Sequence, residues 1–218
     1  MKITIMRDQL IAALCTAATT DIRQYLNGIY VEATSMETRI VATDGTVLSI
    51  QRADAKGDNE VAGVFTMIVP RAAIDKIKKH PMLKTVEINN DGGAWGIVDG
   101  HMRTAFTPTE GYYPDYRRIL PTQTSGETAQ FDPALIAAFA KAAKILGATY
   151  KNLNQVVISH NGFDTPGNIG RRTALVTLGH LTDYIGAISP LAGNATGAGA
   201  THTPAWAFEI LEAADSLV

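Results

Sequence analysis

The residues of this chain that could catalyse a reaction or bind a metal ion do not form a recognisable site. The histidines lack the close spacing of a metal site, and the single cysteine, Cys15, could not complete one. GNIGRR (167–172) could hold a phosphate, but it lacks the Lys-Ser/Thr pair of a phosphate-binding loop, so a turn is the better interpretation. Ser159-His160, and His180 with Asp183, have catalytic residue types but no nucleophile elbow. We therefore expect a protein that is not an enzyme and has no metal or cofactor.

A second cluster, EGYYPDYRRILP (110–121), combines aromatic residues, prolines and arginines. Such a cluster could be an active-site loop, a nucleic-acid-binding patch or a hinge between two domains. Its composition does not distinguish these three, so the elements on either side must decide.

The overall composition narrows the class of protein. A chain of 218 residues, 46% hydrophobic and 18% charged, fits one large or two small globular domains. We expect it to be cytoplasmic, since it shows neither an export signal nor an apolar run long enough to span a membrane. The net charge of −2 excludes a surface that is basic all over, although local basic patches remain possible. Cys15, among helix formers, is expected to be a small buried residue.

The chain contains an internal repeat. LIAALCTAA (10–18) matches LIAAFAKAA (135–143) at six of nine positions, and acidic candidate N-caps, Asp8 and Asp132, precede the two segments. Pro133 adds a helix-start signal to the second copy. Two alanine-rich helices can match by composition alone, but a strand pattern follows each copy at a similar offset, which favours duplication.

Alternating apolar residues predict antiparallel strands around these helices. Thr43-Asp44-Gly45 predicts a tight hairpin turn, because such turns need the positive φ that Gly and Asp tolerate. RAAIDKIKKH (71–80) predicts another helix. The expected strands are 28–33, 39–42, 47–51, 64–69, 85–89, 95–98, 102–107, 156–159, 174–178 and 184–188, and a last helix should follow Thr203-Pro204. This pattern is α+β with antiparallel sheets.

Several motifs in order resemble a known family. YLNG, VATDG, VPR and PDYRRILP together resemble the middle domain of the bacterial DNA polymerase III beta subunit, the sliding clamp. The resemblance covers about residues 1–121 and continues more weakly to residue 147. It implies a DNA-clamp fold, with repeated antiparallel sheets and paired helices on one face. We expect one clamp domain at 1–121 and a second, shortened one at 122–218. PDYRR then becomes a hinge that borders a peptide-binding pocket.

The function implied by this resemblance is that of a processivity factor. Such a clamp encircles duplex DNA with weak direct contacts, and it tethers a DNA polymerase or other clients whose short hydrophobic peptides bind its pocket. A clamp loader is a possible further partner. The alternative is an adaptor with the clamp fold that binds replication, repair or transcription proteins without encircling DNA.

The resemblance also implies the residues of the peptide pocket. At two of these positions, Thr46 and Val47, the family commonly has His-Arg, so the client preference should differ. Alternatively, Leu26, Leu48 and Ile119 are simply core or domain-junction residues. The expected pocket residues are Leu26, Thr43, Gly45, Thr46, Val47, Leu48, Pro114, Arg118 and Ile119.

Basic residues on and beside the predicted helices are candidates for facing DNA. The alternative is that they are solvated, and that Lys78 and Lys79 also favour the negative end of a helix dipole. The candidates are Arg7, Arg23, Arg71, Lys76, Lys78, Lys79, Lys141, Lys144 and Lys151.

The second copy departs from the family. It has 97 residues against 121, so at least one hairpin should be missing. The family's C-terminal Met-Pro-Met-Arg tail is not at the end of the chain, and Ser189-Pro190-Leu191 is its nearest counterpart, unless it is only a strand end. The last predicted helix, AWAFEILEAADSLV (205–218), is acidic, so we expect it to pack on the core or a neighbouring subunit rather than line a DNA channel.

Family rings contain six domain-sized units, so two-domain chains would close as a homo-oligomer of three. A shortened second copy could instead leave an open assembly or a monomer. Such a compact form would suit a phage or a mobile element.

Overall fold

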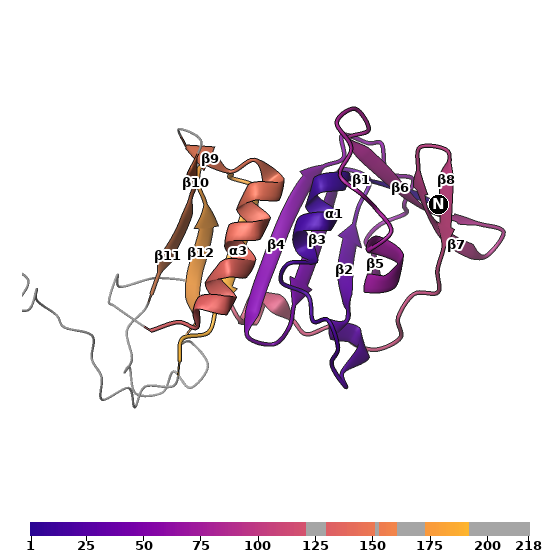
Figure 1. Cartoon of the computed structure of the whole chain (residues 1–218). Helices are drawn as coiled ribbons and strands as arrows, with labels where there is room; N and C mark the ends of the chain where they lie inside the picture. Colours follow the sequence, from indigo (N-terminus) through magenta and orange to yellow (C-terminus); the bar gives the residue numbers. More distant parts are fainter. Residues whose placement is uncertain (121–129, 151–152, 161–172, 192–218) are drawn as a thin grey trace, which may run out of the picture.

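A computed structural model describes residues 1–120, 130–150, 153–160 and 173–191 (Figure 1). Its helices are α1 (Arg7–Ala13), α2 (Arg71–Ile74) and α3 (Pro133–Leu146), with short 3-10 turns at Gln24–Leu26 and Tyr116–Arg118. The strands are β1 (Lys2–Met6), β2 (Gly28–Ala33), β3 (Glu37–Thr43), β4 (Val47–Asp54), β5 (Phe65–Pro70), β6 (Thr85–Asp91), β7 (Ala94–Asp99), β8 (Met102–Ala105), β9 (Thr149–Tyr150), β10 (Leu153–Asn154), β11 (Val156–Ser159), β12 (Ala174–Leu178) and β13 (Tyr184–Ile188). No helix in these described ranges is long and apolar enough to cross a membrane.

The strands form two main antiparallel sheets built from a repeated unit. Seven strands have the order β11-β12-β13-β4-β3-β2-β5, four have the order β1-β6-β7-β8, and β9 and β10 form a separate hairpin. α1 and α2 are each followed by three consecutive strands, β2–β4 and β6–β8, and α3 is followed first by the β9–β10 hairpin and then by β11–β13. The strands that lead into the first two units are exchanged, since β1 pairs with β6 and β5 pairs with β2. This α+β architecture agrees with the predicted fold class.

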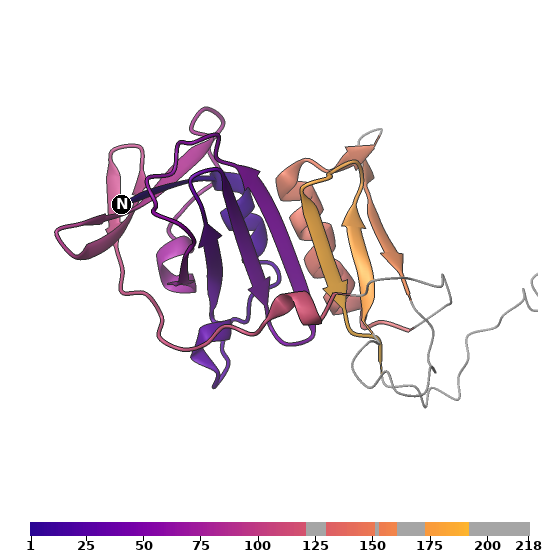
Figure 2. The same cartoon turned by 180° about the vertical axis from the view of Figure 1, so that it is seen from behind.

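The seven-stranded sheet passes without a break from the second copy into the first. Strand β13 pairs with β4 over five residue pairs, from Tyr184 opposite Gln51 to Ile188 opposite Val47. Figures 1 and 2 show α1 and α3 side by side on one face of this sheet. The two helices of the predicted repeat therefore lie together on a common surface.

The side chains of β4 alternate between the two faces of the sheet. Val47 joins the apolar cluster around α3, and the Ser49 hydroxyl lies 2.6 Å from that of Thr16, just after α1. Gln51 donates from Nε2 to the carbonyl oxygen of Gln9 in α1 at 3.0 Å. Leu48, between them, joins a separate cluster on the opposite face, because successive strand residues point to opposite sides.

The segment 113–118, which contains PDYRR, packs on this opposite face, and we call it the strap. The rings of Tyr30 and Tyr113 stack with their centroids 4.9 Å apart, and Tyr116 is buried against β4 and β13. Burial raises the pKa of the Tyr113 hydroxyl. The Tyr116 hydroxyl donates to Glu32 Oε2 at 2.8 Å, and Arg117 donates to both carboxylate oxygens of Glu32. These contacts hold the strap on the face of the sheet opposite α1 and α3, at the place where β4 pairs with β13.

The ends of the helices differ in part from the predictions. Asp132 caps α3 as predicted, because its side chain accepts from the N–H of Ala134 at 2.8 Å. The predicted Asp8 cap is wrong: α1 starts at Arg7, and Asp8 lies in its first turn, where a carboxylate still favours the positive end of the helix dipole.

The helix predicted over 71–80 is also wrong in length, because α2 ends at Ile74. Pro81 disfavours a helical conformation at His80, and the charges of Lys76, Lys78 and Lys79 repel one another. The helix predicted after Pro204 lies outside the described residues, and the domain boundary at residue 121 stays a prediction.

Candidate functional site

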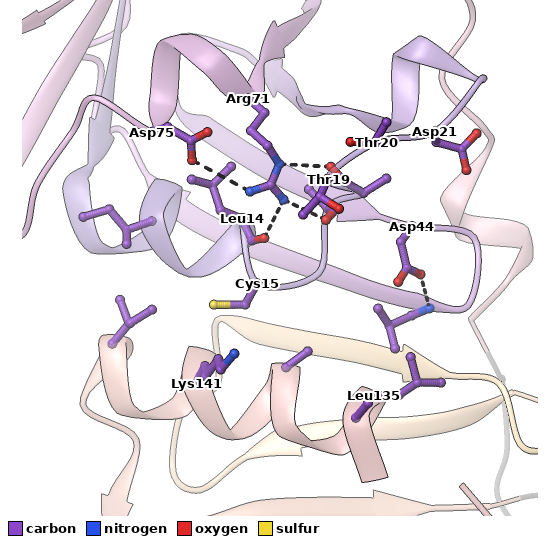
Figure 3. Close-up of a pocket in the computed structure, with 17 residues that line it drawn as sticks. Leu14, Cys15, Thr19, Thr20, Asp21, Asp44, Arg71, Asp75, Leu135 and Lys141 are labelled. Carbon is purple, nitrogen blue, oxygen red and sulfur yellow. Dashed lines mark hydrogen bonds and ion pairs between the residues drawn. The ribbon is translucent and has the colours of Figure 1, made fainter. Parts of the chain in front are cut away.

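A cleft of about 730 Å³ lies between α1 and α3 on the helix-bearing face (Figure 3). Its apolar lining comes from Ile11, Leu14 and Cys15 on the α1 side, and from Leu135 and Ile145 on α3. Lys141 points into it from α3 in Figure 3. Partial burial in this lining raises the pKa of the Cys15 thiol. Asp21, Asp44 and Asp75 also line the cleft, so its lining is mixed, with apolar side chains from both helices and charged groups of both signs.

Arg71 closes one end of the cleft and acts as a structural residue. Its Nε donates to the carbonyl oxygen of Ala18 at 3.0 Å, and its Nη2 donates to those of Leu14 and Ala17 at 2.8 and 2.7 Å. These carbonyls follow α1, where the helix leaves its last acceptors unpaired. The guanidinium of Arg71 is thus bonded within the protein, and its predicted DNA-facing role stays a prediction.

Arg7 is likewise not on a DNA-facing surface. It is 2% exposed, forms an ion pair with Asp99, and donates to the carbonyl oxygens of Leu83 and Lys78 at 2.7 and 2.9 Å. Its position at the first residue of α1 turns its side chain toward the four-stranded sheet. The expected DNA-facing role of Arg7 is wrong for this reason.

Two further candidate cations have partners within the chain. Arg23 forms an ion pair with Asp21 at 2.9 Å, and the hydrogen bond from Arg23 lowers the pKa of Asp21 to about 2. Lys79 donates to the carbonyl oxygen of Ile145 at 3.0 Å, and its Nζ lies 3.7 Å from an Asp8 carboxylate oxygen. Lys79 thus links the start of α1 to the end of α3.

The remaining candidate cations are exposed where the structure describes them. Lys141 and Lys144 stand on α3, and no carboxylate among the described residues lies within ion-pairing distance of either. Lys76 and Lys78 are exposed just after α2. Lys151 lies outside the described residues.

The residues predicted for the peptide pocket gather around the turn between β3 and β4. Three of them are exposed, Gly45, Thr46 and Arg118, and Pro114 and Ile119 are half-buried. The others are buried: Leu26, Thr43, Val47 and Leu48. Leu48 and Ile119 belong to one apolar cluster beneath the strap, so the alternative of core residues holds for Leu48.

The turn itself is held by Asp44. Its Oδ1 accepts from the backbone N–H groups of Thr46 and Val47 at 2.8 and 2.9 Å. Gly45 has φ +98°, a conformation that glycine adopts without strain, as predicted from the Asp-Gly pair. Thr46 therefore lies at the exposed tip of the turn, where its hydroxyl donates to Asp44 Oδ1 at 2.7 Å.

The structure also places Ser189 next to the β3–β4 turn, with Leu191 two residues further along the chain. The N–H of Ser189 donates to the Thr46 carbonyl oxygen at 2.9 Å, and Leu191 is 48% exposed. Thr173, just before β12, donates its hydroxyl to the Ile119 carbonyl oxygen at 2.7 Å. Only the Ser-Pro-Leu resemblance signalled this segment in the sequence, and we now place it beside the β3–β4 turn.

Comparison with known proteins identifies the family behind this arrangement. A family model of the DNA polymerase III beta subunit, central domain, matches residues 4–115. The chain belongs to this family. Its relatives include the beta sliding clamps of Vibrio cholerae, 28% identical over 69% of this chain and 41% of that protein, and of Pseudomonas aeruginosa, 30% identical over 61% and 36%.

Solved clamp structures share the fold. The DNA polymerase III beta subunit of P. aeruginosa aligns with a TM-score of 0.57 at 20% identity, over 88% of this chain and 66% of that one. The sliding clamp of the same organism bound to griselimycin aligns with a TM-score of 0.61 at 18% identity, over 88% and 65%. The chain thus spans about 40% of the length of the curated clamps and about two thirds of these solved chains.

Proposed function

We propose that this chain is a sliding clamp that encircles duplex DNA and holds client proteins, including a DNA polymerase, on it. The observation that carries the proposal is the placement of α1 and α3 side by side on one face of a sheet that runs unbroken from β11 to β5. A ring of such units would place a sheet outside and helices around the DNA. The proposed function is to hold client proteins on DNA, so it involves no chemical reaction.

The charges on the helix-bearing face support sliding rather than tight binding. Lys141 and Lys144 are the exposed cations on α3, whereas Arg7 and Arg71 are used within the protein. Each phosphate contact adds a salt-dependent term to affinity, so a face with few unpaired cations holds DNA weakly. Retention would then depend on ring closure.

Clients would bind at the edge formed by Thr46, Arg118, Ile119 and Leu191. It combines an exposed apolar side chain, a half-buried one and a cation, as peptide grooves commonly do. Because Thr46 replaces the family's histidine, we expect client preference to differ from that of longer clamps. A clamp loader is a further partner under this proposal.

Ring closure requires several copies of this chain. If residues 122–218 form a whole clamp domain, a ring of six domains needs three copies. The described part of that region holds one helix with three strands of the main sheet and the small β9–β10 hairpin, against two units of one helix and three strands in residues 1–121. If it counts as half a domain, the ring needs four copies.

Retention on DNA of different topology tests encirclement. The chain, with a loader if one is needed, should stay on closed circular DNA and be lost when the circle is linearised. Native mass spectrometry on the same sample should give three or four copies. Equal retention on both DNAs, or a monomer at working concentration, would overturn the ring and favour the clamp-fold adaptor.

A further inference from the structure

A smaller cleft, of about 360 Å³, lies beside β5, at one edge of the seven-stranded sheet. Its aromatic lining comes from Tyr30 of β2, Phe65 of β5 and Trp95 of β7, so side chains from both main sheets meet in it. The segment 108–111, which leads to the strap, forms another wall. A cleft of this size is at the small end of the usual range for binding sites and suits the side chains of an extended segment.

The aromatic rings of this cleft are held in place within the protein. Phe65 and Trp95 stack with their centroids 5.5 Å apart, and Tyr30 stacks on Tyr113 of the strap. The three lining rings are half-buried, so part of each stays open to solvent. Side chains that are already fixed lose little conformational entropy when a partner binds, and aromatic residues often dominate the energy of an interface.

The backbone of β5 offers hydrogen-bonding groups at the same place. The Ile68 carbonyl oxygen accepts from the N–H of Thr109 at 2.9 Å, so Ile68 turns its backbone groups away from β2. Thr66, two residues earlier, turns the same way, because backbone groups alternate sides along an antiparallel strand. Thr66 is exposed, and no described residue pairs with its outward N–H and carbonyl groups. Such an open strand edge is a template for an extended segment.

Glu110 supplies the charge of the cleft. It is exposed, it is the only charged residue in the described lining, and no cation among the described residues lies within ion-pairing distance of it. Glu32, which lies opposite Thr66 in β2, is already paired with Arg117. Aromatic rings also attract cations to their negative faces. The cleft therefore suits a basic side chain next to an apolar one.

We propose that this cleft binds an extended peptide segment of a partner protein, one that carries an arginine beside an apolar residue. The peptide pairs with the β5 edge at Thr66, its apolar side chain packs on Phe65 and Trp95, and its arginine meets Glu110. Binding of this kind adds a strand to a sheet, with main-chain hydrogen bonds for affinity and side-chain pockets for specificity.

This surface is separate from the edge proposed to bind clients. The described lining of the cleft contains none of the residues of that edge, which are Thr46, Arg118, Ile119 and Leu191. The inference also needs neither DNA nor ring closure, so it stands or falls independently of encirclement.

Nuclear magnetic resonance of the isotope-labelled full chain tests the cleft, with acetyl-Val-Phe-Arg-Val-amide as the probe. We expect saturable shifts of the Trp95 indole N–H and of the backbone N–H groups of Thr66 and Gly111, with a dissociation constant in the millimolar range. The matched peptide acetyl-Val-Phe-Glu-Val-amide should bind at least about fivefold more weakly, because its carboxylate faces that of Glu110.

Two exposed positions of the cleft can be changed without opening the core. Glu110→Gln should weaken binding of the arginine peptide about twofold to fivefold, the range for one exposed ion pair, and about 1 M salt should remove that difference. Thr66→Pro removes the outward N–H and leaves the pairing with β2 in place, so it should lower affinity about twofold to tenfold. Asp58→Asn, at an exposed carboxylate between β4 and β5, is the matched control and should leave affinity unchanged.

The proposal is overturned if the arginine peptide shows no saturable binding, or if the glutamate peptide binds equally well. It is also overturned if Glu110→Gln and Thr66→Pro, both folded by circular dichroism, keep the wild-type affinity. Arg118→Ala should leave this binding unchanged. A loss of affinity in Arg118→Ala would mean that the peptide occupies the edge proposed for clients, and the assignment to this cleft would be wrong.

Discussion

Phe139 of α3 lies directly against Gly186 of β13. A Cβ atom added to Gly186 would be 2.6 Å from Phe139 Cε1, closer than two carbon atoms can approach without movement. The same Cβ would lie 3.1 Å from the Leu48 carbonyl oxygen of β4. This glycine therefore allows α3 to sit on the sheet at the junction of the two copies.

We predict that Gly186→Ala destabilises the protein by about 1–3 kcal/mol, because an overpacked core must shift Phe139 or the backbone of β4. Urea unfolding measures the change. Val157→Ala, at an exposed position of β11, should change the free energy of unfolding by less than about 0.5 kcal/mol. Equal effects of the two substitutions would mean that α3 does not press on β13.

The Arg7–Asp99 ion pair gives a second prediction. Asp99→Ala should cost about 3 kcal/mol or more, because it leaves the guanidinium of Arg7 buried without its counter-charge. Lys144→Ala should leave stability nearly unchanged, because Lys144 is exposed. Chemical denaturation of both variants distinguishes the two kinds of cation.

A comparison of Lys144→Ala with Arg7→Met separates DNA-facing cations from structural ones. Removing Lys144 should lower the slope of log affinity against log salt by about 1 if it contacts a phosphate. A folded Arg7→Met variant should keep the wild-type slope. A lower slope for Arg7→Met would restore Arg7 as a DNA-facing residue.

Some features of this protein could be predicted from its sequence, and others could not. Gly45 and the β3–β4 hairpin were predictable, because a turn depends on the backbone preferences of neighbouring residues. The same holds for Asp132 and Pro133 at the start of α3. Such signals are local in the chain.

The errors about Arg7 and about the cleft arise because they depend on contacts between segments that are distant in the sequence. Arg7 looks like any basic residue at a helix end, and only the fold brings Asp99 close to it. The cleft between α1 and α3 was missed as well, because Leu14 and Leu135 match core positions in the repeat, and nothing local shows that they remain partly exposed.

The contact between Glu32 and the strap predicts a dependence on pH. Burial alone would raise the pKa of Glu32, but the hydrogen bonds from Arg117 and Tyr116 outweigh burial and hold this pKa below its ordinary value. The contribution to stability is therefore present above the unfolded-state pKa of about 4.3 and is lost as the pH falls through the lower folded-state pKa. Glu32→Gln should be less stable than wild type at pH 7, and the difference should shrink as the pH falls below about 4.

Unfolding curves of wild type and Glu32→Gln at a series of pH values measure this difference. Asp54→Asn, at the exposed end of β4, is the control for the loss of one carboxylate. A difference between wild type and Glu32→Gln that stays constant with pH would mean that the strap does not depend on the charge of Glu32.

The last prediction concerns the edge at which clients are proposed to bind, formed by Thr46, Arg118, Ile119 and Leu191. Leu48 is 1% exposed, so Leu48→Ala would remove core packing at a cost of about 2–5 kcal/mol and could not report on a groove. Arg118 and Leu191 are exposed and can be changed without opening the core. We choose a short hydrophobic peptide from a client polymerase as the probe, since the proposed function gives this edge such peptides to bind.

Titration calorimetry should show that this peptide binds the wild-type chain, with a loss of at least about fivefold in affinity for Arg118→Ala and Leu191→Ala. Met36→Ala is the matched control, because Met36 is 61% exposed in the turn between β2 and β3, outside the proposed edge. Thr46→His, which restores the family's histidine at an exposed position, should strengthen binding. Wild-type affinity in both Arg118→Ala and Leu191→Ala, or no binding by the wild-type chain, would remove the groove from this edge.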